Sequence, residues 1–225
     1  MLKSAMLMTK DSRTLTPLTL QDGSLISIKK IFQNWRAPES KGPLVLSSVL
    51  FYFSWFGIIY YASEDKPGLC FLVTLSTLTM HFLWVSREPR LELLLFPILA
   101  SLGFLMDGLG TATDLLRFSP QSPVPPIWLF EVWLIFVMTF RYSLSFFLRK
   151  RAFGATLAFF CAPINYGVFG KTWSLAEYGA PKAFTMVAHG GLWALFFWYL
   201  GPTYRFLETA LRARIYRNQS NQTSN

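Results

Sequence analysis

The chain has 225 residues, of which 52% are hydrophobic and 17% aromatic, while only 15% are charged. Soluble domains carry roughly 25% charged residues, and a single soluble core does not need this much apolar material. The composition therefore excludes an ordinary soluble domain and predicts several membrane spans. The apolar runs are continuous rather than alternating with period two, which favours helices over a transmembrane barrel.

The net charge of +9 invites a nucleic-acid partner, but membrane topology explains it better. Lys and Arg collect on the cytoplasmic loops of membrane proteins, and here they fall in short groups between apolar runs. We predict no nucleic-acid partner. The two cysteines, Cys70 and Cys161, lie inside apolar runs and are expected to be buried reduced thiols. Without a disulfide or zinc-binding pattern, no metal and no cofactor is predicted.

Three regions follow one another along the chain. Residues 1–41 are polar, and the stretch "SLISIKKIFQNW" (24–35) favours a short amphipathic helix on the lipid surface over an unordered tail. Residues 42–204 form the membrane domain, and 205–225 form a basic tail. Six apolar runs predict an all-α polytopic bundle of about six spans, at 44–62, 67–85, 91–111, 127–148, 152–170 and 181–200.

Proline, glycine and charged residues separate these apolar runs. The proline-rich loop "FSPQSPVPP" (118–126) cannot continue a helix, and Gly201-Pro202 is expected to break or kink the last span. Counted alternately, one side holds "SREPR" (86–90), "RKR" (149–151) and the basic tail, while the other side is poorer in Lys and Arg. The positive-inside rule then predicts that both termini are cytoplasmic.

Ionisable and polar residues inside spans are costly, and they usually face the bundle interior. Depths counted at about 1.5 Å per residue separate them into two layers. We expect an outward-facing polar pocket from Asp107, Glu131, Asn165, Tyr166 and His189. The inner half holds His81 and Arg141; His81 is expected to make a satisfied polar contact, whereas Arg141 could snorkel to the cytoplasmic headgroups.

Asp107 is the strongest functional candidate of this set. Gly108 and Gly110 follow it and weaken the helix, so that carbonyls could open toward a cavity. A functional and a structural role are equally compatible with this pattern. For His189, which heads "HGG", close helix packing is as good an explanation as chemistry.

The stretch "APINYGVFG" (162–170) interrupts the fifth run. Pro163 removes a helix donor, and such breaks form binding sites in some transporters, although a simple kink is the favoured interpretation. Tryptophans such as Trp133 and Trp193 are typical of the aromatic belts at membrane interfaces. A flat aromatic pocket for a lipid or quinone would show the same sequence pattern. Phosphate loops and hydrolase motifs are absent from the sequence, so catalysis is not favoured.

The order and spacing of four pieces resemble a family of uncharacterised bacterial inner-membrane proteins, domain-of-unknown-function family 2878. The pieces are "YFSWFG" (52–57), "LLLFPILASLGFLMDGLG" (93–110), "PPIWLFEVWLIFVMTFRYSL" (125–144) and "APINYGVFG" (162–170). The resemblance covers about 48–200. Where the family commonly has a histidine near "FRYSL", this chain has Phe140 and Arg141, which weakens any fixed chemical role there.

The resemblance implies a bacterial inner-membrane location and, because members neighbour fatty-acid-modifying genes, lipid-related work. The first hypothesis is therefore a non-enzymatic accessory or structural protein of a lipid-related process. It would contact the lipid bilayer and a membrane protein partner or a second copy of the chain. The alternatives are a small transporter or channel using the pocket around Asp107, and a membrane-embedded lipid-modifying enzyme with Asp107, Glu131 or His189 as acid or base.

Overall fold

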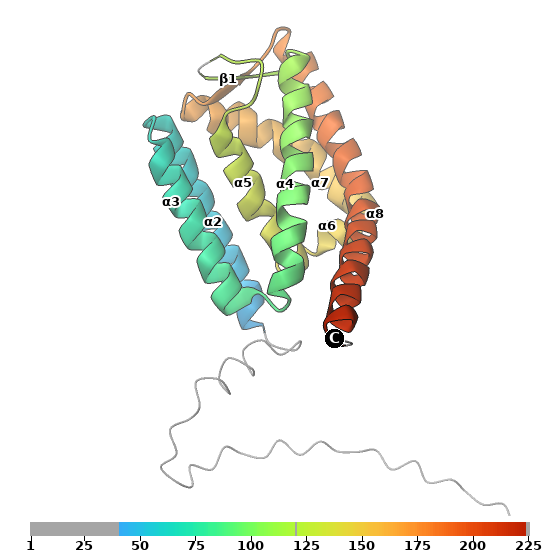
Figure 1. Ribbon diagram of the computed structural model, residues 1–225. Coiled ribbons are helices and arrows are strands. Elements are labelled where there is room, and N and C mark those ends of the chain that lie inside the picture. Colours follow the sequence, from blue (N-terminus) through green and yellow to red (C-terminus); the bar gives the residue numbers. More distant parts are fainter. Residues whose placement is uncertain (1–40, 120, 224–225) are drawn as a thin grey trace, which may run out of the picture.

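The computed structural model describes residues 41–119 and 121–223, with side chains as far as residue 215 (Figure 1). The predicted amphipathic helix at 24–35 lies outside these residues. Five helical stretches are long and apolar enough to cross a membrane. They are α2 (Gly42–Ser63), α3 (Pro67–Met80) with the π-helical η1 (His81–Val85), α4 (Pro89–Ala112), α7 (Arg151–Ile164) with the π-helical η3 (Asn165–Gly170), and α8 (Lys182–Thr223). The all-α transmembrane bundle predicted from the sequence is confirmed.

Prolines mark where three of these helices begin. Pro43, Pro67 and Pro89 occupy the first turn of α2, α3 and α4. Proline is tolerated there because the first backbone N–H groups of a helix have no partner within it. The predicted starts of the second and third spans, at 67 and 91, therefore coincide closely with the observed helix starts.

The predicted span at 127–148 is not one continuous helix. It consists of α5 (Ile127–Val137), the 3₁₀ turn η2 (Met138–Arg141) and α6 (Phe146–Arg149). Tyr142 leaves helical geometry, with φ −123° and ψ −105°. Its hydroxyl is held from outside the segment, because it donates to Glu92 and accepts from the backbone N–H of Arg87. These tertiary contacts hold Tyr142 in its non-helical conformation, so the helix is interrupted there.

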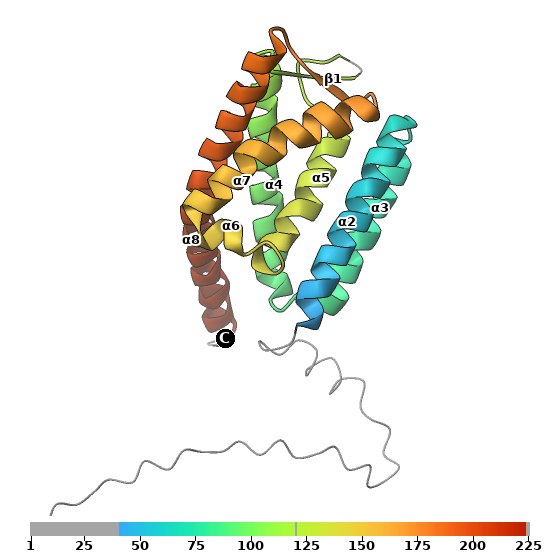
Figure 2. The same ribbon diagram turned by 180° about the vertical axis from the view of Figure 1, so that it is seen from behind.

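The three pieces nevertheless carry the chain from the β1 end of the bundle back toward the opposite end (Figures 1 and 2). The chain thus makes six passages, and both the start of α2 and the end of α8 lie at the same end of the bundle (Figure 1). That this end is cytoplasmic stays a prediction.

A small antiparallel hairpin closes the other end. β1 (Leu116–Phe118) follows α4, and β2 (Ala176–Tyr178) precedes α8, with Leu116 opposite Tyr178. These two strands were not predicted from the sequence. Their pairing fixes Tyr178 above the interior, where its side chain is buried.

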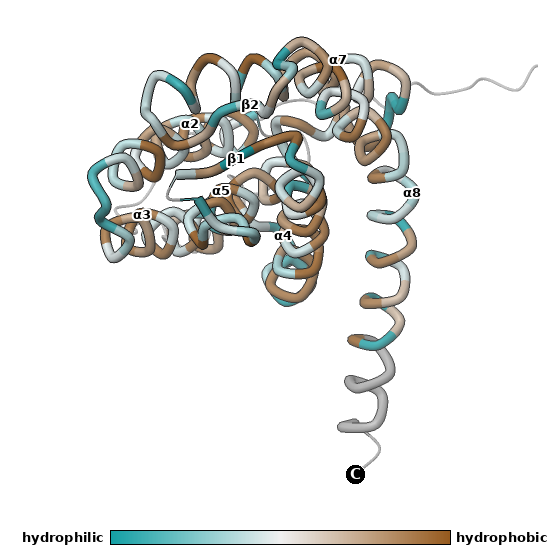
Figure 3. Tube along the Cα trace, turned by 90° about the horizontal axis from the view of Figure 1, so that it is seen from above, coloured by the Kyte–Doolittle hydropathy of each residue, from teal (hydrophilic) through white to brown (hydrophobic). Residues whose placement is uncertain are grey.

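Helix α8 continues through Gly201-Pro202, so of the predicted break or kink the break does not occur. Pro202 lies inside the helix, and Leu200 and Tyr204 on either side of it are buried. Packing of these side chains offsets the hydrogen bond that proline removes. Gly201 permits close contact with α6, since a Cβ there would lie 2.6 Å from the Leu148 carbonyl oxygen. Seen from above, the C-terminal part of α8 extends away from the bundle (Figure 3).

Helix α4 lies at the centre of the bundle. In its most apolar window 44% of the residues are buried, against 28% in α2 and in α3. Its inward side chains pack with α5 and α8 around Leu95, Leu99, Trp133, Ile135 and Phe197. Polar groups that α4 directs inward therefore reach several other elements at once.

Candidate functional site

Asp107, on α4, is completely buried and lies at the centre of a polar cluster. Its Oδ2 accepts hydrogen bonds from Trp133 Nε1 at 2.8 Å and from the Tyr166 hydroxyl at 2.8 Å. Its Oδ1 accepts from Trp193 Nε1 at 3.2 Å. The three donors come from α5, η3 and α8, so one carboxylate joins four parts of the bundle.

His189 extends this cluster toward the hairpin. Its Nε2 lies 3.6 Å from Asp107 Oδ1, and its Nδ1 lies 2.9 Å from the Tyr178 hydroxyl. Burial, together with the charge of Asp107, raises the pKa of the Tyr178 hydroxyl, so that it stays protonated and can donate to Nδ1. In that tautomer Nε2 carries the proton, and its N–H faces Asp107. The 3.6 Å between Nε2 and Asp107 Oδ1 is too long for a hydrogen bond, so Nε2 has no hydrogen-bond partner.

Two local features of the sequence make this cluster possible. At Gly103 a Cβ would lie 2.3 Å from the Trp133 ring, so only glycine leaves room for the indole to reach Asp107. Two residues after Pro163, the helix changes from α to π geometry at Asn165. Within this wider turn Tyr166 points inward; π-helical turns often occur at functional sites.

Three of the five residues predicted for the outer pocket converge, namely Asp107, Tyr166 and His189. Glu131 and Asn165 do not join them. Glu131 lies two positions before Trp133 on α5, faces α3, and accepts a hydrogen bond from Thr74 Oγ1 at 3.1 Å. The Asn165 side chain is exposed on the outer surface. The predicted set therefore mixes two faces of the bundle.

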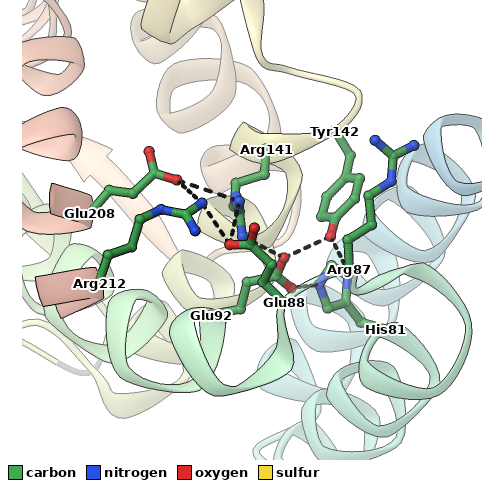
Figure 4. A network of polar contacts seen from close by, with 8 residues as sticks. All are labelled: His81, Arg87, Glu88, Glu92, Arg141, Tyr142, Glu208 and Arg212. Carbon is green, nitrogen blue, oxygen red and sulfur yellow. Dashed lines mark hydrogen bonds and ion pairs between the residues drawn. The ribbon is translucent and has the colours of Figure 1, made fainter. Parts of the chain in front are cut away.

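A second buried carboxylate, Glu92, forms its own cluster nearer the start of α4 (Figure 4). Its Oε2 lies 3.0 Å from His81 Nε2. Its Oε1 accepts from Arg141 Nη1 at 2.9 Å and from the Tyr142 hydroxyl at 2.7 Å. Glu92 and His81 are completely buried.

Arg141 connects Glu92 to the C-terminal part of α8. Its Nη2 lies 3.1 Å from Glu88 and 3.4 Å from Glu208, and Arg212 contacts the same two carboxylates at 2.7 and 2.9 Å. Burial opposes the charge of Glu88, but hydrogen bonds and charges from Arg212 and Arg141 outweigh it and hold the pKa of Glu88 below its usual value. The Arg141 side chain is only 16% exposed, so it turns inward rather than snorkelling to headgroups as predicted.

Sequence reasoning missed several members of both clusters. Glu92 lies at the start of the predicted span 91–111, but it was not among the polar residues singled out inside the spans. Trp133 and Trp193 were assigned to interfacial belts, yet they are 2% and 8% exposed and bind Asp107. The spacing of four residues between Glu88 and Glu92 was an available signal, because it places both carboxylates on one face of α4.

The two clusters are separate. They lie 15 residues apart on α4, about 22 Å at the helical rise of about 1.5 Å per residue. Leu95, Leu99 and Ala100 fill the interval and are completely buried. Across residues 41–119 and 121–223, no group of three or more His, Cys, Asp or Glu side chains is arranged so that it could hold a metal ion.

A groove of about 460 Å³ lies on the outside, between α2 and α3. Ser54 and Thr77 are hydrogen-bonded to each other across it and are nearly buried. Most of the other lining side chains are apolar, among them Leu50, Phe53, Leu69, Leu72, Val73 and Met80. Phe53 is 78% exposed, so the groove opens on a face that membrane lipid covers.

These features define a polytopic α-helical membrane protein with two enclosed polar clusters and an apolar outer groove. Residues 44–199 match the model of the family described as protein of unknown function DUF2878, and the chain belongs to that family. The resemblance inferred from the sequence is confirmed. No curated protein and no solved structure matches the chain.

Proposed function

We propose that this is a non-enzymatic accessory protein of the bacterial inner membrane that serves a lipid-related process by holding a lipid acyl chain. The observation that carries the proposal is the groove between α2 and α3, which is apolar, open to the lipid face and bounded by helices with little interior contact. A membrane protein partner would then receive or act on the lipid held there.

The hydrogen bonding of the two buried carboxylates supports this proposal. Asp107 and Glu92 each use their two oxygens for three hydrogen bonds from other elements. Buried carboxylates with such partners fasten helices together, and they leave little hydrogen-bonding capacity for a substrate. The surface that remains for recognition is the outer face.

Gly57 allows a direct test of the groove. It lines the groove, and a Cβ there would face the Val73 side chain at 3.4 Å, so Gly57→Leu fills the space between α2 and α3. Gly68→Leu is the matched control, because nothing lies within 4 Å of its Cβ and it does not line the groove. Both full-length variants are reconstituted with a phosphatidylcholine that carries a photoreactive group on its acyl chain.

The expected result is a severalfold loss of crosslinks to α2 and α3 in Gly57→Leu, with crosslinks to the exposed Phe160 of α7 as the internal reference. Gly68→Leu should retain the wild-type pattern. Equal crosslinking of α2, α3 and α7 in the wild type would mean that the groove has no preference for lipid, and the proposal would fail.

A second candidate is a small proton-coupled carrier, favoured by the chain Tyr178–His189–Asp107. This chain runs from the hairpin to the interior, and the Nε2 of His189 has no hydrogen-bond partner. If the chain conducts protons, Asp107→Asn abolishes pH-driven flux in proteoliposomes while Asp114→Asn, an exposed aspartate at the end of α4, does not. Flux that is unchanged, or absent from the wild type, removes this candidate.

A further inference from the structure

The two ends of the bundle differ in charge balance. At the hairpin end, four cations (Lys66, Arg117, Lys171 and Lys182) lie among four acids (Glu64, Asp65, Asp114 and Glu177). Two of these cations form ion pairs, with Glu64 and with Asp114. At the opposite end the acids Glu88 and Glu208 are occupied by Arg141 and Arg212. Four other cations at that end, described next, form no ion pair with a carboxylate among the described residues.

These four cations gather where α6, α7 and α8 meet, and we call them the basic patch: Arg149, Lys150, Arg151 and Arg205. All four are exposed, and among the described residues none of them forms an ion pair with a carboxylate. Arg149 only donates to the Ser145 hydroxyl, at 3.2 Å.

Backbone contact brings the two halves of the basic patch together. Gly201 of α8 touches the carbonyl of Leu148, the residue before Arg149. Arg205 follows Gly201 by four residues and therefore lies on the same face of α8, one turn farther along. Helix α7 begins at Arg151, and the partial positive charge of its first turn adds to the patch.

Exposed, unpaired cations avoid the hydrocarbon layer, so the basic patch is expected to reach the level of the headgroups. The stretch Arg151–Gly170 that begins at the patch has 20 residues, a length of about 30 Å along a helix that runs obliquely to α2 and α4 (Figure 2). Phe206 and Trp198, which are 73% and 44% exposed, flank Arg205 on α8. Exposed aromatic side chains at this level favour contact with the interface and the upper acyl chains.

We propose that the basic patch binds the phosphate of an anionic phospholipid headgroup, with Phe206 against the acyl chains. Arginine suits this role because its guanidinium can donate two parallel hydrogen bonds to phosphate oxygens. The site is separate from the α2–α3 groove, and it does not depend on the function proposed for that groove. A membrane with anionic lipid in the leaflet at this end supplies the ligand.

The test counts the phosphatidylglycerol molecules that the full-length protein retains when it is released from phosphatidylcholine nanodiscs containing a minority of phosphatidylglycerol. The patch variant changes Arg149, Lys150, Arg151 and Arg205 to Gln. The control variant changes the hairpin-end cations Lys66, Arg117, Lys171 and Lys182 to Gln, so both variants lose the same charge. Native mass spectrometry gives the ratio of the two bound lipids.

Each cation near the surface contributes up to about fivefold to the affinity, so the four together contribute up to about 600-fold, and we expect the patch variant to lose about a hundredfold or more in this ratio. The control should stay within about twofold, because its four cations lie among four acids at the other end of the bundle. Arg205→Gln alone should lower the ratio, and Arg205→Lys should lower it less, because lysine keeps the charge and loses the paired hydrogen bonds; this order separates charge from folding. Equal losses in both four-residue variants, or retention by the patch variant, would overturn the proposal. Displacement of the lipid by inorganic phosphate would assign the patch to a soluble anion and overturn it as well.

Discussion

Asp107→Asn tests how the central carboxylate stabilises the bundle. The amide keeps one oxygen, which can accept the two hydrogen bonds that Trp133 and Tyr166 now give to Oδ2. Its NH2 group then faces the Trp193 N–H in place of Oδ1, so two donors oppose each other. A lost hydrogen bond between membrane helices costs about 0.6 kcal/mol on average and up to about 1.7 kcal/mol. A buried donor left without an acceptor brings the cost to about 1–3 kcal/mol.

The free energy of unfolding is measured by titrating the reconstituted protein with SDS in mixed micelles, followed by tryptophan fluorescence. Trp133 and Trp193 are bound to Asp107, so their emission should change together with stability. Asp114→Asn is the matched control, because Asp114 is 61% exposed and has a positive φ that Asn adopts readily. A loss below about 0.5 kcal/mol in Asp107→Asn, within the range of surface substitutions, would refute the fastening role.

Three further outcomes follow from the packing and the charges. Gly103→Ala should lower the free energy of unfolding by about 1–3 kcal/mol, because its Cβ would overlap the Trp133 indole ring. Gly108→Ala, whose Cβ would have its nearest neighbour at 3.7 Å, should cost less, and equal losses in the two variants would contradict the packing argument. Glu92→Gln removes one of the three carboxylates around Arg141, which keeps Glu88 and Glu208, and should cost about 1–3 kcal/mol in the same SDS titration. A loss under about 0.5 kcal/mol would be incompatible with a stabilising ion pair. The pKa of Glu88 is lowered in the folded protein. The stabilisation by its charge is therefore complete above the unfolded pKa of about 4.3 and is lost as pH falls through the folded pKa. Glu88→Gln should flatten the loss of stability that the wild type shows from about pH 5 downward, and an unchanged pH profile would exclude the effect.

The hydropathy pattern was sufficient for most of the fold because each lipid-facing run must be apolar over its whole length. It failed at 127–148, where the run is apolar but the helix breaks at Tyr142. That break depends on a hydroxyl bound to Glu92, a residue 50 positions away, and no local pattern encodes it. It failed again at Gly201-Pro202, where contact with α6 keeps the helix intact.

The polar site could be predicted only in part. The cost of burying charge singled out Asp107 and His189, and the proline break drew attention to Tyr166. Depth along a helix gives the level of a side chain but not its direction around the axis. This is why Glu131, at a suitable level, faces α3 instead of Asp107. Tyr178 could not be found at all, because its position depends on the pairing of β2 with a strand that is also three residues long.

The central claim is that the function resides on the outer groove and that the Asp107 cluster fastens the helices. The most direct measurement compares the lipid composition of a strain lacking the protein after complementation with Gly57→Leu or with Asp107→Asn, each expressed at the wild-type level in the membrane. We predict that Asp107→Asn restores the wild-type lipid profile and that Gly57→Leu does not. Restoration by Gly57→Leu together with failure of Asp107→Asn would contradict the account and place the active centre at the Asp107 cluster.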